Sequence, residues 1–188
     1  MTLGAHLLMS WLSTVELVKH RRERTLIALS GVAPDLDGLG IIVDKLTGST
    51  DYYLRFHHCI GHSLLSAFLI AGIATFFAKS QKKLVGMMSF IIVHLHILCD
   101  VLGSKGPDGF QWPVYYLYPI DLDFYLIWAY QWELSAWPNH LVMAVLFALS
   151  LYYAVKKKIS FIEVISPYLD REGFAIFQKY VCKKGKRD

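Results

Sequence analysis

The stretch "LVGMMSFIIVHLHILCD", residues 84–100, is apolar for its first ten residues and then carries three ionisable side chains. A long apolar run of this kind predicts a helix that is buried in a core or in a membrane. His96 and Asp100 are four residues apart and share one helix face, whereas His94 points elsewhere, about 240° around the helix from Asp100. We therefore predict that His96 and Asp100 act together, and that His94 has a structural or supporting role.

The composition of the chain favours a membrane protein with one domain. Of its 188 residues, 55% are hydrophobic and 18% are charged, and the mean hydropathy is +0.40. The length suits a single domain, and so much apolar surface argues against disorder. The three cysteines form no CxxC motif, which argues against a disulfide framework and a zinc ribbon, so Cys59 and Cys99 are expected to be small buried residues.

Apolar segments with helical character recur along the chain, and no alternating strand pattern is evident. We predict an all-α fold, a helical bundle embedded in a membrane with four to five transmembrane helices. Residues 1–155 would form this single domain, and residues 156–188 an amphipathic, basic C-terminal tail. The expected helices cover residues 3–18, 25–43, 60–78, 84–103 and 138–155.

The basic residues alternate between the connections in the manner of a multi-pass membrane protein. If each segment crosses once, one side holds residues 19–24, 79–83 and 156–188, which carry 16 of the 19 Lys and Arg residues. The positive-inside rule then predicts a cytoplasmic C-terminus. The two connections on the outer side hold only Lys45, Arg55 and Lys105, and the longer of them is rich in Trp and Tyr.

Ionisable residues inside the apolar segments fall at one depth under this topology, toward the outer face. Such residues are costly in a membrane and usually mark a functional site. Pro34 should break the helix just before the aspartates of "PDLDG" and let both turn toward one centre. His58 and His62 would share a helix face if their helix began early, or His57 could reach the site from the loop. The predicted metal ligands are His6, Asp35, Asp37, His57, His62, His96 and Asp100.

Mixed imidazole and carboxylate ligands suit a borderline or hard divalent ion, with Zn²⁺ as the first expectation and Mn²⁺ as the second. The number of ligands exceeds the needs of one tetrahedral zinc, so two ions that share a bridging aspartate fit the count better than one. Asp37 or Asp35 could serve as the general base. Arg55 and Lys105 are the cations near the outer face that could hold an anionic substrate group.

These motifs together resemble a known family. His6, "PDLDG", "HHCIGHSLL" and "HILCD" followed by a glycine-containing loop and "WP" are similar to the YdjM-like metal-dependent hydrolases of bacterial inner membranes, over about residues 1–120. In that block His57 and His62 match family histidines, whereas His58 stands where the family has arginine. The order of ligands also resembles the zinc-dependent phospholipases C and single-strand nucleases, although their second H-x3-D/E pair is absent because Ala144 follows His140.

The resemblance implies a membrane-bound hydrolase of the bacterial inner membrane that uses metal-activated water on a phosphoester or a lipid-like ester. The alternative is a metal-binding membrane protein without catalysis, such as a transport component or a sensor. Membrane lipids and a small-molecule or lipid substrate are the expected partners. The basic tail "CKKGKRD" is better explained by anionic lipid than by nucleic acid, so no specific nucleic-acid partner is expected.

Overall fold

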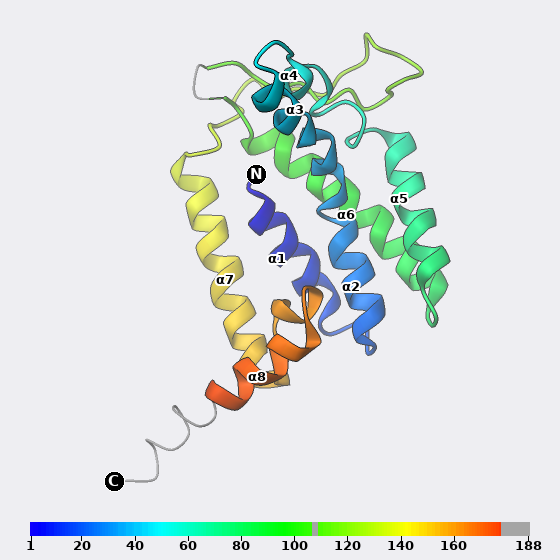
Figure 1. The fold of residues 1–188 in the computed structure, drawn as a ribbon, viewed down its shortest axis with the longest axis vertical. Coiled ribbons are helices and arrows are strands. Elements are labelled where there is room, and N and C mark those ends of the chain that lie inside the picture. The colour runs from blue at the N-terminus through cyan, green and yellow to red at the C-terminus, as the bar shows by residue number, and fades with distance from the viewer. Residues whose placement is uncertain (107–108, 178–188) are drawn as a thin grey trace.

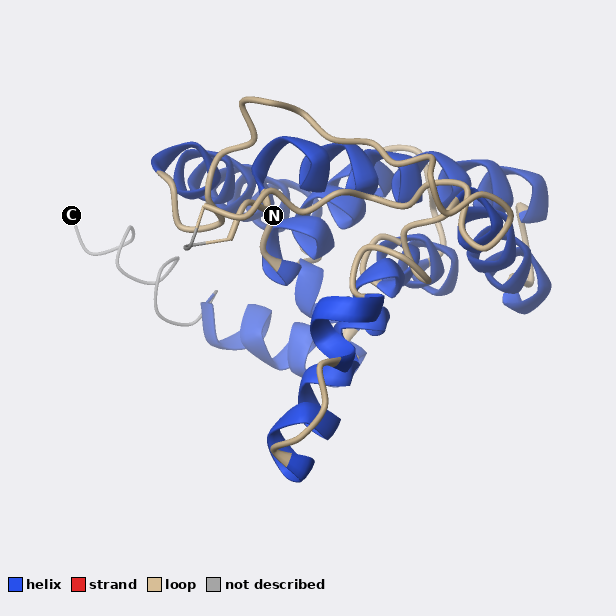
Figure 2. Ribbon diagram, turned by 90° about the horizontal axis from the view of Figure 1, so that it is seen from above, coloured by secondary structure: helices blue, strands red, loops and turns tan. Residues whose placement is uncertain are grey.

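The computed structural model describes residues 1–106 and 109–177. Within them the regular elements are α-helices and 3₁₀ turns, and strand pairing is limited to two isolated bridges (Figure 2). The all-α prediction is therefore confirmed. The elements are α1 Leu3–Thr14, α2 Arg21–Ser30, η1 Ala33–Leu39, α3 Gly40–Thr47, α4 Tyr52–Phe56, α5 Leu64–Phe77, α6 Lys82–Gly103, α7 Trp137–Lys157, η2 Phe161–Val164 and α8 Pro167–Phe177.

Helix α6 is the longest described element, with 22 residues, and lies at the centre of the helix contacts. It packs against α5 on one side and α2 on another, and α1 joins α2 to α7 (Figure 1). The short elements η1, α3 and α4 gather at the upper end in this view, where the long connection between α6 and α7 also runs. The upper end thus combines irregular backbone with the first turns of α1 and the last turns of α6.

Two helices, α6 and α7, are long and apolar enough to cross a membrane. A third span is possible if α2 and the η1–α3 segment, which meet at a 49° bend, count as one broken helix. The structure therefore supports two or three candidate spans, fewer than the four to five that were predicted. Helix α5 has 14 residues and α1 has 12, and both fall short of the roughly 20 residues that a straight span needs.

The predicted helix over residues 25–43 is interrupted, and the break comes earlier than the one expected at Pro34. Helix α2 ends at Ser30, and the chain continues as the seven-residue 3₁₀ turn η1. Pro34 stands at the start of η1, where its missing N–H costs no helical hydrogen bond. At Gly31 a Cβ atom would overlap Ser10 and Ile92, so a glycine there allows α1, α2 and α6 to approach closely.

The predicted helix over residues 60–78 begins later than expected. Ser63 caps α5, because its hydroxyl accepts a hydrogen bond from the amide of Ser66 at 3.2 Å. Residues 57–63 are consequently a loop, in which His58 adopts φ +68°. His58 and His62 therefore do not share a helix face, and this loop brings the histidines to the upper end by another route.

Among the described residues, the segments rich in Lys and Arg, 19–24, 79–83 and 156–158, lie toward the opposite, lower end of the bundle (Figure 1). There η2 packs against α2, and α8 packs on η2. Glu163 of η2 forms a two-pronged ion pair with Arg24 of α2 at 2.6 and 2.7 Å. Trp11 also donates its ring N–H to Glu163 at 2.9 Å. The predicted basic tail therefore includes a docked part, while residues 178–188, with Cys182, lie outside the described residues.

This ion pair gives the first prediction. Arg24 and Glu163 are both buried, so Arg24→Met should leave an unpaired carboxylate and lower the free energy of unfolding by roughly 3–5 kcal/mol. The double variant Arg24→Met, Glu163→Gln should recover much of that loss, because Trp11 still has an acceptor. Unfolding in detergent micelles, followed by tryptophan fluorescence, measures both. A double variant no more stable than the single one would contradict this account.

Candidate metal centre

Four side chains from three parts of the chain converge at the upper end of α6. Asp35 comes from η1, His62 from the loop before α5, and His96 and Asp100 from successive turns of α6. One ligand atom from each lies within 4.8 Å of those of the other three. His62, His96 and Asp100 are buried, whereas Asp35 is partly exposed. This group of four could bind a metal ion.

Hydrogen bonds on the rear side of each imidazole determine which nitrogen faces the centre. His96 Nδ1 donates to the Gly31 carbonyl at 2.7 Å, and His62 Nδ1 donates to Asp37 Oδ2 at 3.0 Å. A neutral imidazole has one N–H, so these two bonds place it on Nδ1 in both rings. The Nε2 lone pairs then point into the cluster, as in the metal sites where a carboxylate or carbonyl orients a histidine ligand.

With both imidazoles in this neutral form, the centre gathers electron pairs, and none of the four side chains is a cation. The two Nε2 atoms of His62 and His96 are 3.1 Å apart, and Asp100 Oδ2 lies 2.9 Å from the His96 nitrogen and 3.3 Å from the His62 nitrogen. Asp35 Oδ1 approaches the same two nitrogens at 3.5 and 3.9 Å. Two imidazoles and two carboxylates so placed fit the donor set of a divalent ion.

Asp100 presents its second oxygen to another partner. Its Oδ1 lies 3.3 Å from His6 Nε2 and contacts the Met1 ammonium. The His6 ring stacks on His96 with centroids 3.7 Å apart, and neither His6 nitrogen has a hydrogen-bond partner among the described residues. Asp100 thus faces the main cluster with one oxygen and His6 with the other, which is the arrangement that a bridging carboxylate requires.

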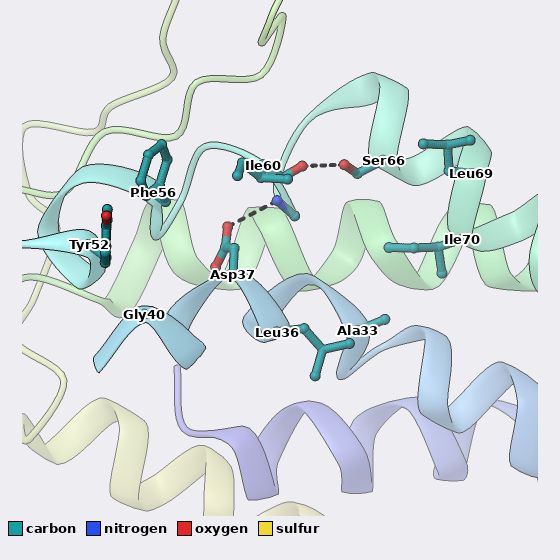
Figure 3. Close-up of a pocket in the computed structure, with 11 residues that line it drawn as sticks. Ala33, Leu36, Asp37, Gly40, Tyr52, Phe56, Ile60, Ser66, Leu69 and Ile70 are labelled. Carbon is teal, nitrogen blue, oxygen red and sulfur yellow. Dashed lines mark hydrogen bonds between the residues drawn. The ribbon is translucent and has the colours of Figure 1, made fainter. Parts of the chain in front are cut away.

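Asp37 lies behind His62 instead of inside the cluster of four. Its Oδ1 accepts a hydrogen bond from His57 Nδ1 at 2.8 Å, and its Oδ2 accepts from His62 Nδ1 at 3.0 Å. Oδ2 also accepts from the Gly61 amide at 3.0 Å, the bond drawn at Asp37 in Figure 3. A Cβ at Gly61 would overlap the Pro34 carbonyl, so glycine is needed for this approach. The two aspartates of "PDLDG" therefore face different groups, Asp35 the ligand cluster and Asp37 the backs of the histidines.

Two cavities flank η1. One of about 400 Å³ is lined by Asp35 and Asp100 together with Tyr53, His58 and Trp112, and so opens onto the cluster. The other, of about 550 Å³, lies beside Asp37 and is otherwise mostly apolar (Figure 3). The second cavity is larger, but Asp37 is the one predicted site residue that lines it, and the oxygens of Asp37 are already hydrogen-bonded. The first cavity is therefore the better place for chemistry.

The remaining predicted site residues divide by position. Lys105 lines a third cavity of about 600 Å³ that shares Tyr53, Ser104, Trp112 and Leu134 with the 400 Å³ cavity. Arg55 is exposed on α4 and lines neither. His94 Nδ1 donates to the Phe90 carbonyl at 2.8 Å, and the Nε2 atom of the neutral ring accepts from the Tyr116 hydroxyl at 2.9 Å. His94 therefore points away from the cluster.

Several residues of the site were not singled out by the sequence. Trp112 and Tyr53 form aromatic walls of the cavity, and Gln131 holds the end of α6 by donating to the Asp100 carbonyl at 2.9 Å. The sequence shows that the α6–α7 connection is rich in Trp and Tyr, but only the contacts in the structure identify Trp112 as a wall of the cavity. Cys59 is buried as expected, and burial raises the pKa of its thiol to about 11, whereas Cys99 is only partly buried.

A family model described as YdjM inner membrane protein matches residues 1–161. The chain belongs to the YdjM inner membrane protein family. The match covers the whole ligand cluster and extends beyond the region of residues 1–120 on which the resemblance rested. No significant match to this chain is found among curated proteins or among solved structures. The family places the chain in the inner membrane, in agreement with its long apolar helices.

The geometry of this YdjM-family site gives the second prediction. His62→Ala, His96→Ala and Asp100→Ala should each remove most of the bound metal, because each deletes an atom of the mutually close set. His94→Ala is the matched control on the same helix and should keep the metal. Elemental analysis of detergent-purified protein measures the content. Equal metal content in all four variants would rule out this cluster as the binding site.

Proposed function

We propose that the protein is a membrane-bound, metal-dependent hydrolase that acts on a phosphoester or a lipid-like ester. The observation that carries the proposal is the convergence of two Nδ1-protonated imidazoles and two carboxylates beside an accessible cavity. A divalent ion bound there would lower the pKa of a coordinated water and polarise an ester oxygen. The accessible cavity supports catalysis over storage, since a purely structural ion is normally enclosed by its ligands.

Zn²⁺ is the proposed metal, with Mn²⁺ as the second candidate, because the donors are imidazole and carboxylate without thiolate. Asp35, His62, His96 and Asp100 would hold one ion. His6 and the Oδ1 atom of Asp100 would contribute to a second, since His6 has two buried nitrogens without hydrogen-bond partners among the described residues. His57 and Asp37 would then orient the ligands from behind.

The two aspartates of η1 are suited to different roles. Asp35 lines the 400 Å³ cavity and is partly exposed, so it can take a proton from water there or complete the ligand set. Asp37 is committed to His57, His62 and Gly61, which leaves its carboxylate little freedom to act as a base. We therefore assign general-base or ligand duty to Asp35, and the orientation of His62 to Asp37.

The cavity beside the cluster has a neighbour that could hold the rest of a substrate. The 400 and 600 Å³ cavities share four lining residues and so lie side by side, with Asp35 and Asp100 lining the first and Lys105 lining the second. The ammonium of Lys105 could hold an anionic group of the substrate, whereas Arg55 is a weaker candidate because it lines neither cavity. Apolar walls such as Leu54 and Leu134 are compatible with a lipid-like substrate.

The alternative function is metal binding without catalysis, in a transport component or a sensor. It shares the ligand cluster and differs in leaving the cavities without a substrate. A specific nucleic-acid partner is not proposed, because the basic segments gather at the end of the bundle opposite the cluster (Figure 1). Their position agrees with a cytoplasmic basic end that contacts anionic lipid, and with a metal centre toward the outer face of the membrane.

The third prediction tests the chemistry. Activity on phosphodiester and carboxylic ester reporters should vanish with a chelator and return with Zn²⁺ or Mn²⁺. Asp37→Asn should weaken metal affinity roughly 10- to 100-fold, as for other residues that orient a ligand, and activity should recover when excess metal is supplied. Asp35→Asn should leave activity low by roughly 10²–10⁴-fold even at full metal occupancy.

The control for this experiment is the metal content of each variant, measured in the same samples. A fully metallated wild-type protein that is inert on both ester classes would favour the non-catalytic alternative. An Asp37→Asn variant that stays inactive at full occupancy would instead return the role of general base to Asp37.

The fourth prediction concerns topology. Alkaline phosphatase, which is active only after export, should be silent when fused after residue 188 and active when fused after residue 110. The reason is the concentration of Lys and Arg at the end that holds α8, which should stay in the cytoplasm. Green fluorescent protein fused at the same two points is the reciprocal control. The inverse pattern would place the metal centre on the cytoplasmic side.

A further inference from the structure

His58 occupies a conformation that its residue type rarely adopts. It lies in the loop between α4 and α5 with φ +68°, in the left-handed region that favours glycine. His58 is nevertheless buried, with 2% of its surface exposed, and it lines the 400 Å³ cavity together with Asp35 and Asp100. Non-glycine residues held in such backbone conformations cluster at functional sites, where the surrounding structure enforces them.

The contacts of His58 explain how its ring is held in place, but they give its Nδ1 atom no hydrogen-bond partner among the described residues. Its carbonyl accepts the Tyr115 amide at 3.0 Å, and its ring meets Trp112 edge to face, with centroids 5.2 Å apart. The ring also lies 4.6 Å from that of His62. Its Nδ1 is buried without a hydrogen-bond partner among the described residues. A buried polar atom of this kind is costly unless a ligand uses it.

We propose that His58 binds a phosphate-type oxyanion in the cavity, by donating a hydrogen bond from its ring while the anion contacts the metal held by the neighbouring cluster. This inference rests on the proposed metal centre but does not require turnover. A role as a further metal ligand is less favoured, because His58 is not among the residues whose ligand atoms lie within 4.8 Å of one another. An imidazole carries an N–H donor in either protonation state, so the contact does not depend on its titration.

The test measures anion binding by metal-loaded protein in detergent. Calorimetric titration with inorganic phosphate should give a dissociation constant that rises about 10- to 100-fold in His58→Asn, the loss expected for one hydrogen bond to a charged group. Asparagine tolerates positive φ but is shorter than histidine. His58→Gly, which suits the backbone best, should show the same loss. His94→Asn is the control, since His94 is bonded to Phe90 and Tyr116 outside the cavity.

A second titration with short-chain phosphatidic acid distinguishes the sources of the anion. Tighter binding than inorganic phosphate, with the same dependence on His58, would identify a lipid head group. Equal binding of the two would identify free phosphate. A measurement on the wild-type protein, the shift of the His58 ring ¹⁵N resonance on addition of phosphate, is independent of any variant and of its folding.

The outcomes separate this inference from the proposed hydrolase. Loss of phosphate affinity at unchanged metal content supports it, even if no ester is cleaved. Three results overturn it: metal lost from the His58 variants, which would make His58 a ligand; phosphate affinity unchanged in them; or no phosphate binding and no ¹⁵N shift in the wild-type protein.

Discussion

The structure is organised around a buried excess of electron pairs at the upper end of α6. Asp100 is 2% exposed, and its carboxylate lies within hydrogen-bond distance of the Nε2 atoms of two imidazole rings. Both rings carry their N–H on Nδ1, which faces away from Asp100. Such a group is stable only with a proton or a cation between its members. The break at Pro34, the loop 57–63 and the close approach at Gly31 all serve to bring donors to this point.

The two ends of the bundle each contain buried carboxylates, but their negative charge is balanced in different ways. At the lower end the buried carboxylate of Glu163 is neutralised within the chain by Arg24, and Trp11 satisfies a further lone pair. At the upper end no arginine or lysine is supplied to Asp35 or Asp100 within the described residues; the Met1 ammonium is the cation that contacts Asp100. The contrast argues that the upper carboxylates are arranged for a bound ion and the lower one for stability.

The sequence predicts which side chains of α6 lie together better than it predicts the path of the chain around them. The spacing of His96 and Asp100 places them on one helix face because an α-helix has a fixed period, and the divergence of His94 follows from the same period. The separation of Asp35 from Asp37 could not be predicted, because their orientations depend on a 3₁₀ turn and on the Gly61 amide, 24 residues away. Helix α5 starts later than predicted because the hydroxyl of Ser63 caps it. The apolar pattern, which includes Ile60, gave no sign of this boundary.

The predicted number of spans, four to five, is not confirmed, for a related reason. Hydropathy measures the composition of a segment, whereas a span also needs about 20 residues of continuous helix. Within the part of the chain that the structure describes, α6 and α7 are the helices that meet both conditions alone. Helix α7 is largely exposed on its apolar faces, with side chains such as Leu141, Phe147 and Leu151 about half exposed. In a protein of an inner-membrane family, those faces are the ones that lipid would cover. The shorter helices α1 and α5 instead pack against α2 and α6, so their apolar residues help to support the metal-binding end of the bundle. The candidate metal centre thus lies where the long helix α6 meets irregular backbone, which a membrane tolerates only where protein surrounds it.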